Sequence, residues 1–169
     1  MGSDFGKAVE EAFTSRQFRD ALGCFATGIT VVTAHPAGYK PIGLTVNSFA
    51  SVSLDPALVL WSLDRNSENQ APYLQADHFG INILDETQQD ISTRFATRGK
   101  HDFKPGEYEV WETGAPIIPQ TLAQFDCRVK KRIDGGDHVI FLGEVVRIAS
   151  RVGKPLIYSG GGYSRLDNL

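Results

Sequence analysis

The stretch Ala123-Gln124-Phe125-Asp126-Cys127-Arg128-Val129-Lys130 gives the clearest indication of the fold. Apolar and polar side chains alternate along it with a period of two, which is typical of a β-strand that buries one face. Gly135-Gly136 follows, and residues 138–148 are again rich in β-branched and apolar side chains. Because glycine supplies the positive φ angles of tight hairpin turns, the sequence predicts an antiparallel hairpin here.

Further strands and a few short helices are predicted along the rest of the chain. Apolar or β-branched runs indicate strands at 29–34, 42–55, 57–63 and 79–84, and the run 57–63 is expected to be buried on both faces. Helical spacing predicts one helix from Ser15, the expected N-cap, to Thr27-Gly28, and others at 68–76 and 87–95. The charged segment 96–105 is expected to be an exposed loop.

This pattern favours a mainly β fold, a barrel or a sandwich, with two or three short helices. No Gly-x-Gly-x-x-Gly motif and no Walker-type glycine loop occurs, so neither a Rossmann domain nor a P-loop is predicted. Residues 1–14 are expected to be a loose lead-in, and residues 15–169 to form a single domain.

Composition excludes several classes of protein. A formal charge of -3, with 41% hydrophobic and 22% charged residues, is ordinary for a globular protein and disfavours nucleic acid as a partner. The two cysteines, Cys24 and Cys127, show no metal-ligand spacing, so no metal site is predicted and both are expected in the core. No signal pattern and no membrane-length apolar run is found, which favours the cytoplasm and no membrane association.

The run from Gly43 to Pro56 is unusually rich in short polar side chains and contains no basic residue. Thr45, Asn47, Ser51 and Ser53 stand at odd positions, so they are predicted to share one side of an extended segment. Such groups suit a small molecule that lies close against the backbone. An ordinary Ser/Thr-rich strand and turn explains the run equally well, and both readings are open from the residues alone.

Five motifs occur together in one order and resemble the flavin reductase-like family. They are Phe18-Arg19-Asp20-Ala21-Leu22, Ala26-Thr27-Gly28-Ile29-Thr30-Val31-Val32-Thr33, Gly43 to Pro56, Gly136-Asp137-His138 and Pro155-Leu156-Ile157-Tyr158. This resemblance covers residues 18–166 and implies an FMN-binding split β-barrel of antiparallel Greek-key type, as a homodimer. It also implies NAD(P)H-dependent reduction of FMN or FAD, with reduced flavin passed to a partner monooxygenase.

The resemblance also implies which residues form the site. Thr45, Val46, Asn47 and Ser48, with Ala50 beside them, are expected along the flavin ring, and Ser51 and Ser53 at the phosphate. Completing the flavin site are Asn66, Ser67, Phe95, Arg98 and Lys100. The nicotinamide is expected to meet Gly28, Tyr163 and His138, although Tyr163 packed at the C-terminus is an equal alternative.

His138 is the expected catalytic residue on this resemblance, since a polar ring beside the flavin supports alignment of the nicotinamide. From the residues alone, a histidine at the start of a strand after a glycine turn is predicted to be an ordinary polar surface residue. His101 and Asp102 either border the ligand or belong to a solvated loop.

Three functions remain open from sequence: a flavin reductase, a flavin-binding module for electron transfer or sensing, and a ferric or haem-related reductase. FMN is preferred over FAD, and NADH and NADPH are not distinguished. Fold analogy alone does not separate these functions.

Overall fold

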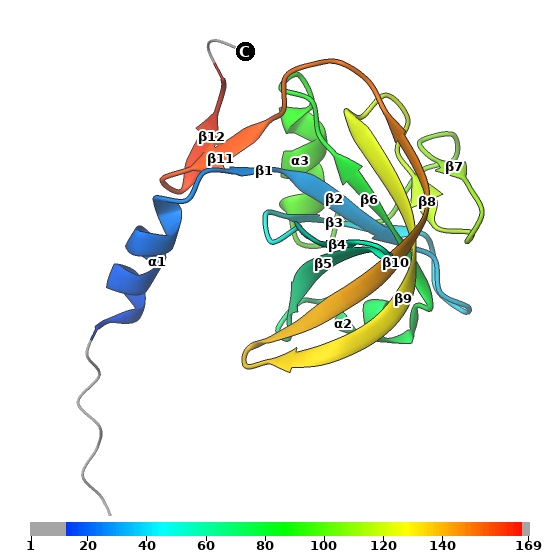
Figure 1. The fold of residues 1–169 in the computed structure, drawn as a ribbon, viewed down its shortest axis with the longest axis horizontal. Helices are drawn as coiled ribbons and strands as arrows, with labels where there is room; N and C mark the ends of the chain where they lie inside the picture. The colour runs from blue at the N-terminus through cyan, green and yellow to red at the C-terminus, as the bar shows by residue number, and fades with distance from the viewer. Residues whose placement is uncertain (1–12, 167–169) are drawn as a thin grey trace, which may run out of the picture.

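The computed structural model describes residues 13–166, and its centre is one antiparallel sheet of seven strands (Figure 1). The strand order is β3-β2-β6-β9-β10-β5-β4. The bounds are β2 Thr30–Ala34, β3 Ile42–Val46, β4 Ala50–Leu54, β5 Ala57–Asp64, β6 His78–Ile83, β9 Ala123–Gly135 and β10 His138–Ser150. The predicted mainly β class is thereby confirmed, as are the hairpins β2–β3 and β9–β10.

The β9–β10 turn differs slightly from the expected two-glycine connection. Gly135 still pairs with His138, so the turn consists of Gly136-Asp137 alone, and Gly136 has a φ of 77°. One positive φ at the first central position is sufficient for a two-residue hairpin turn. This places His138 at the first position of β10.

The sheet is rolled, because its two edge strands are consecutive in the chain. Six spacings of about 4.8 Å would separate β3 from β4 by about 29 Å in a flat sheet. Only residues 47–49 connect Val46 to Ala50, and such a link spans at most about 14 Å. The two edges therefore come together at this end, which gives an open barrel with a seam between β3 and β4.

The predicted single extended segment across residues 42–55 is wrong for the same reason. The run divides into β3 and β4, which lie on opposite edges of the sheet, and β4 has an irregular register between Ser51 and Ser53. Thr45 and Ser53 consequently do not line one continuous strand face. Alternate residues share one face only within a single continuous strand, and here the chain leaves β3 before it enters β4.

Three short helices and two small sheets complete the fold. The helices are α1 Ser15–Gly23, α2 Gln70–Gln75 and α3 Gln89–Ala96. One small sheet contains β1 Thr27–Gly28, β11 Ile157–Ser159 and β12 Gly162–Ser164, and the other pairs β7 Glu109–Val110 with β8 Pro116–Ile117. No helix within residues 13–166 is both long enough and apolar enough to cross a membrane.

Helix α1 differs from its prediction in its start, end and burial. Its N-cap is Thr14, not Ser15, and the Thr14 and Gln17 side chains form a reciprocal capping box. The helix ends at Gly23, and no residue in it is buried, because it projects from the barrel (Figure 1). Cys24, which follows it, is exposed and not in the core as expected, whereas Cys127 is buried as predicted.

The main core lies inside the rolled sheet. Trp61 stacks on Phe141 with ring centroids 4.6 Å apart, and Phe79 and Tyr73 meet Trp61 edge-on. Along β5 only alternate residues are fully buried, so burial on both faces is not found within this single chain. A second apolar cluster, which contains Phe95, fills the space between α3 and the sheet.

Candidate functional site

The link across the seam is held in place by side-chain hydrogen bonds. The Ser48 hydroxyl accepts from the Ser62 N–H at 2.9 Å and lies 3.2 Å from the Ser62 carbonyl, to which it can donate. On the other side, the Thr45 hydroxyl donates to the Ser92 carbonyl of α3 at 2.7 Å. Asn47 is thereby fixed between β5 and α3 while its own side chain is exposed.

A cavity of about 390 Å³ opens beside this link. It brings together eight residues predicted for the site, which come from the end of β3, the link, the loop after β5, the segment after α3 and the start of β10: Thr45, Val46, Asn47, Ser48, Asn66, Ser67, Arg98 and His138. His101, for which the sequence left a ligand-bordering position open, also lines it, and its other lining residues were not predicted: Leu44, Ser62, Asp64, Glu68 and Ala96. For Asp64 and Glu68, the only signal in the sequence was the polar run that begins at Asp64 and marks the loop after β5.

A second cavity of about 380 Å³ shares Thr45, Val46, Asn47 and Ala96 with the first. Tyr163 lines it, and the Tyr163 hydroxyl lies 2.9 Å from the buried Ser92 hydroxyl. Asn47 therefore borders two adjoining spaces. Gly28 lies in the neighbouring strand β1, opposite Ile157, and does not line either cavity.

His138 is oriented by its neighbour in the β9–β10 turn. Its Nδ1 lies 2.7 Å from a carboxylate oxygen of Asp137, and this hydrogen bond is the main cause that lowers the pKa of Asp137. Arg65 braces the turn, because its Nε donates to the Gly136 carbonyl at 2.9 Å and its Nη2 to Asp134 at 2.7 Å. With Nδ1 engaged by a carboxylate, Nε2 is the nitrogen left for a ligand.

A buried histidine closes another wall of the first cavity. The His101 side chain contacts the Gly43 carbonyl through Nδ1 at 3.0 Å and Glu68 through Nε2 at 2.9 Å. His101 thus borders the cavity and is not the solvated loop residue that one of the two sequence readings proposed. The expectation that all of 96–105 is exposed is accordingly wrong at this position.

Several predicted residues lie elsewhere. Ala50, Ser51 and Ser53 are on β4, outside both cavities, because the chain has already crossed the seam. Phe95 is 2% exposed and packs beneath Gly43, where an added Cβ would come within 2.7 Å of its ring. Its predicted ligand contact is corrected to a core position, since an aromatic at helical spacing equally suits burial.

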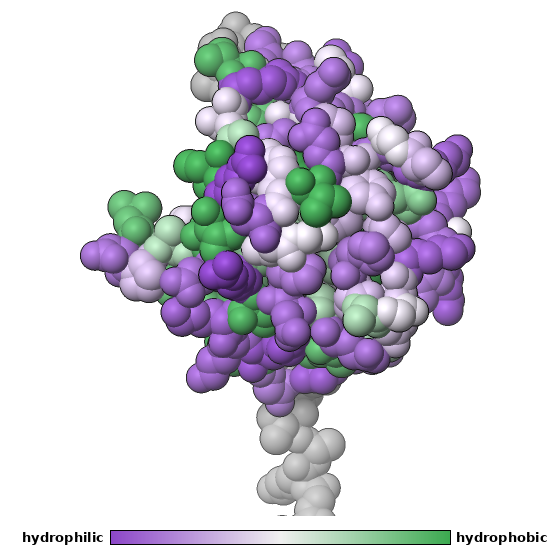
Figure 2. Space-filling model, turned by 90° about the vertical axis from the view of Figure 1, so that its right-hand side faces the viewer, coloured by the Kyte–Doolittle hydropathy of each residue, from purple (hydrophilic) through white to green (hydrophobic). Residues whose placement is uncertain are grey.

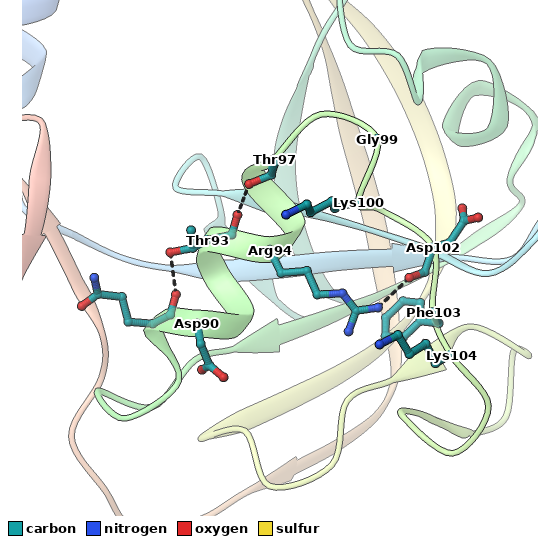
Figure 3. Close-up of a pocket in the computed structure, with 10 residues that line it drawn as sticks. Asp90, Thr93, Arg94, Thr97, Gly99, Lys100, Asp102, Phe103 and Lys104 are labelled. Atoms are coloured by element: carbon teal, nitrogen blue, oxygen red, sulfur yellow. Dashed lines mark hydrogen bonds between the residues drawn. The ribbon is translucent and has the colours of Figure 1, made fainter.

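Lys100 points into a third, larger space of about 840 Å³ on the outer side of α3 (Figure 3). This space carries charges of both signs, with Asp90 and Asp102 among its lining residues. Arg94 reaches across it and donates to the Asp102 carbonyl at 2.7 Å, as the dashed line in Figure 3 shows. The loop after α3 therefore separates Lys100 from the cavity beside Asn47.

Comparison with known proteins identifies related chains over nearly the whole length. The family model described as "Flavin reductase like domain" matches residues 22–167. The FMN reductase (NADH) SmoA of Agrobacterium fabrum is 52% identical over 154 residues, which cover 90% of this chain and 87% of that protein.

Two further relatives extend the comparison. The reductase component of the flavin-dependent trigonelline monooxygenase of Acinetobacter baylyi is 43% identical over 88% of this chain, which spans 48% of that protein. A solved structure of the Streptomyces globisporus NADH:FAD oxidoreductase SgcE6, in complex with NAD and FAD fragments, has a TM-score of 0.82 and 34% identity. That alignment covers 89% of this chain and 92% of the other.

Proposed function

Because the chain belongs to the flavin reductase-like family, we propose that it transfers a hydride from NADH to a flavin and releases the reduced flavin. FMN is the proposed acceptor, in keeping with the similarity to an FMN reductase (NADH), and FAD is the alternative suggested by the SgcE6 relative. The observation that carries this proposal is the position of Asn47, between two adjoining cavities at the seam of the barrel.

The residues at the seam fit a flat ligand with polar edges. Within residues 13–166, the backbone of residues 47–49 forms no hydrogen bond with other backbone groups, and the side-chain amides of Asn47 and Asn66 have no protein partner, although the Asn66 N–H donates to Asp64. These groups offer donors and acceptors at short range, which alternating ring carbonyls and nitrogens require. Cavities of this size also lie within the usual range for small-molecule sites.

The phosphate is proposed to lie at a different place from the one that the sequence predicts. Since Ser51 and Ser53 are outside the cavity, its Ser67 hydroxyl and Arg98 guanidinium are the groups suited to an anion. Arg98 already contacts Glu68 at 3.2 Å, so part of its charge is compensated before any ligand binds. Phosphate binding there would depend on hydroxyl and amide groups as well as on charge.

A bound flavin supplies the hydride acceptor, so that NADH, one proton and oxidised flavin give NAD⁺ and reduced flavin. The chain's own residues then have the tasks of holding, aligning and shielding the two rings. His138, fixed by Asp137, is proposed to align the nicotinamide through Nε2. Tyr163, anchored to Ser92, is proposed to shield the neighbouring space from water.

A homodimer is proposed as the working form. The apolar face of α1 is uncovered: Phe18 and Leu22 in the helix, and Phe25 just after it, are each more than half exposed. A nine-residue helix is marginal in water without packing, so this face needs a cover. Other apolar side chains, Val152 among them, are exposed as well. The face drawn in Figure 2 is mostly hydrophilic. Sedimentation equilibrium tests the dimer, and a monomer at micromolar concentration would contradict it.

An oxygenase that receives the reduced flavin is proposed as the partner, because relatives are named as reductase components of monooxygenases. The decisive test of the function is steady-state oxidation of NADH with and without added FMN. Turnover that rises with FMN and saturates supports the reductase. Stoichiometric, tightly held FMN with negligible turnover would instead indicate a binding module, and a rate that requires ferric chelate would indicate an iron reductase.

A further inference from the structure

The loop between α3 and Phe103 forms one wall of the cavity beside Asn47, and His101 is its most deeply buried side chain. His101 is 7% exposed and lies between two oxygen atoms: the Gly43 carbonyl, 3.0 Å from Nδ1, and Glu68 Oε1, 2.9 Å from Nε2. A carbonyl and a carboxylate only accept hydrogen bonds. Both ring nitrogens can therefore be satisfied together only when each carries a proton, as in the imidazolium.

Glu68 is held as the carboxylate that this arrangement needs. The Gly99 N–H donates to it and is the largest cause that lowers its pKa, followed by the hydrogen bond from Arg98 and the charge of His101. The carboxylate precedes α2, yet its partners all belong to the loop after α3. It thus joins two segments that are about 30 residues apart in the sequence.

The outer side of the loop is fastened by contacts that do not involve the His101 ring. The Gly43 N–H donates to the His101 carbonyl at 2.9 Å, and Lys40 pairs with Asp102 at 3.2 Å. Arg94, itself paired with Glu107 at 2.7 Å, donates to the Asp102 carbonyl (Figure 3). None of these contacts depends on the charge of the His101 ring. That charge therefore affects only the side of the loop that faces the cavity, where the ring meets Glu68 and the Gly43 carbonyl.

We propose that His101, as an imidazolium paired with Glu68, is a positioning residue for the flavin. Through its contact with the Gly43 carbonyl, His101 connects the loop that carries Arg98 to β3. Asn47 follows directly after β3. A neutral ring carries only one of the two protons, so either the Gly43 carbonyl or the Glu68 carboxylate would face a nitrogen lone pair, and the wall would loosen. This inference rests on the proposed function and adds a residue whose contribution depends on pH.

The predicted consequence is a flavin affinity that is higher when both His101 nitrogens carry protons, and that therefore falls as pH rises. The other titratable or charged groups around the cavity and loop are Asp64, Arg98, Lys100, His138 with Asp137, Lys40 with Asp102, and Arg94 with Glu107. His138 is the other histidine of the cavity, so the test must separate the two. The turnover number at saturating flavin is expected to change little, because His101 acts through the wall and not on the transferred hydride.

The test is a titration of the full chain with FMN, followed by flavin fluorescence, at several values between about pH 5 and pH 8. At the acidic end, His101→Gln and Glu68→Gln should each weaken binding about tenfold and remove the pH dependence. The double variant should be no weaker than either single variant, because the two groups act as one pair. His35→Gln, at an exposed position, is the matched control and should behave as the wild type.

The wild-type pH dependence should persist in His138→Gln, and its loss there would assign the effect to His138 and overturn the proposal. Unchanged FMN affinity in folded His101→Gln, or strictly additive effects in the double variant, would also overturn it. If His101→Gln does not fold, Glu68→Gln and the wild-type pH titration decide. A wild type that binds no FMN would refute the proposed function itself, which is a distinguishable outcome.

Discussion

Replacing Ser48 with alanine removes the side chain that pins the seam of the barrel to β5. Two hydrogen bonds are lost, from the Ser62 N–H at 2.9 Å and to the Ser62 carbonyl at 3.2 Å. Each net contribution is about 0.5–1.5 kcal/mol, but Ser62 is only partly buried, so water can replace part of the loss. We therefore expect Ser48→Ala to lower the free energy of unfolding by about 1–2 kcal/mol.

Urea unfolding measures this loss, and thermal unfolding should show a melting temperature lower by about 2–8 °C for a chain of this size. FMN binding should weaken as well, because Asn47 precedes Ser48 in the link. Ser51→Ala is the control: Ser51 is exposed on β4, and its hydroxyl makes no hydrogen bond within the described part of the chain. Equal stability of the Ser48 and Ser51 variants would refute the claim that Ser48 fixes the link.

Four further outcomes are expected. Asn47→Ala should raise the dissociation constant for FMN by about 5- to 150-fold, since unpaired polar groups cost about 1–3 kcal/mol, and an unchanged constant in fluorescence titrations would contradict the site. His138→Ala should slow hydride transfer or raise the KM for NADH while flavin affinity is kept, as stopped-flow absorbance can show. Gly143→Ala should cost about 1–3 kcal/mol in urea unfolding, because its Cβ would come within 2.3 Å of the Phe79 ring. Hydrogen bonds from Thr87 and then from Arg151 lower the pKa of Asp85. The ionised carboxylate should therefore stabilise the fold above the ordinary carboxyl pKa, and this stabilisation should be lost as pH falls through the lowered pKa. Asp85→Asn should reduce the loss of stability at acidic pH in urea unfolding.

The strands were predictable where local pattern alone determines them. Alternation in β9 and the glycine turn after it specify the β9–β10 hairpin, and β-branched residues specify β2. The division of 42–55 into β3 and β4 was not predictable, since every residue in the run is compatible with an extended chain. Only the closure of the sheet, a long-range property, requires the crossing at residues 47–49.

Residues of the candidate site were predictable where they belong to the segment that crosses the seam or to a motif of the family. Thr45 to Ser48, Asn66 and His138 are brought together as expected. Ser51 and Ser53 lie outside both cavities, because the prediction extended the pattern of one strand past a change of sheet edge. Glu68 and His101 were missed as partners, because the pairing of two charged loops depends on how α2 and α3 are placed against the sheet and leaves no local signal.

The rolled sheet itself explains why the proposed ligand site lies at this place. Inside a sheet each strand satisfies the backbone groups of its neighbours, but residues 47–49 pass from one edge to the other and form no such ladder. Backbone polar groups must find partners, and here water or a ligand can supply them. Ser48 and Thr45 fix the link through their hydroxyls. The unpaired backbone polar groups of residues 47–49 are therefore held in a fixed orientation. Closure of the barrel and the proposed flavin site therefore both depend on one short crossing, and a variant that relaxes the crossing should affect both.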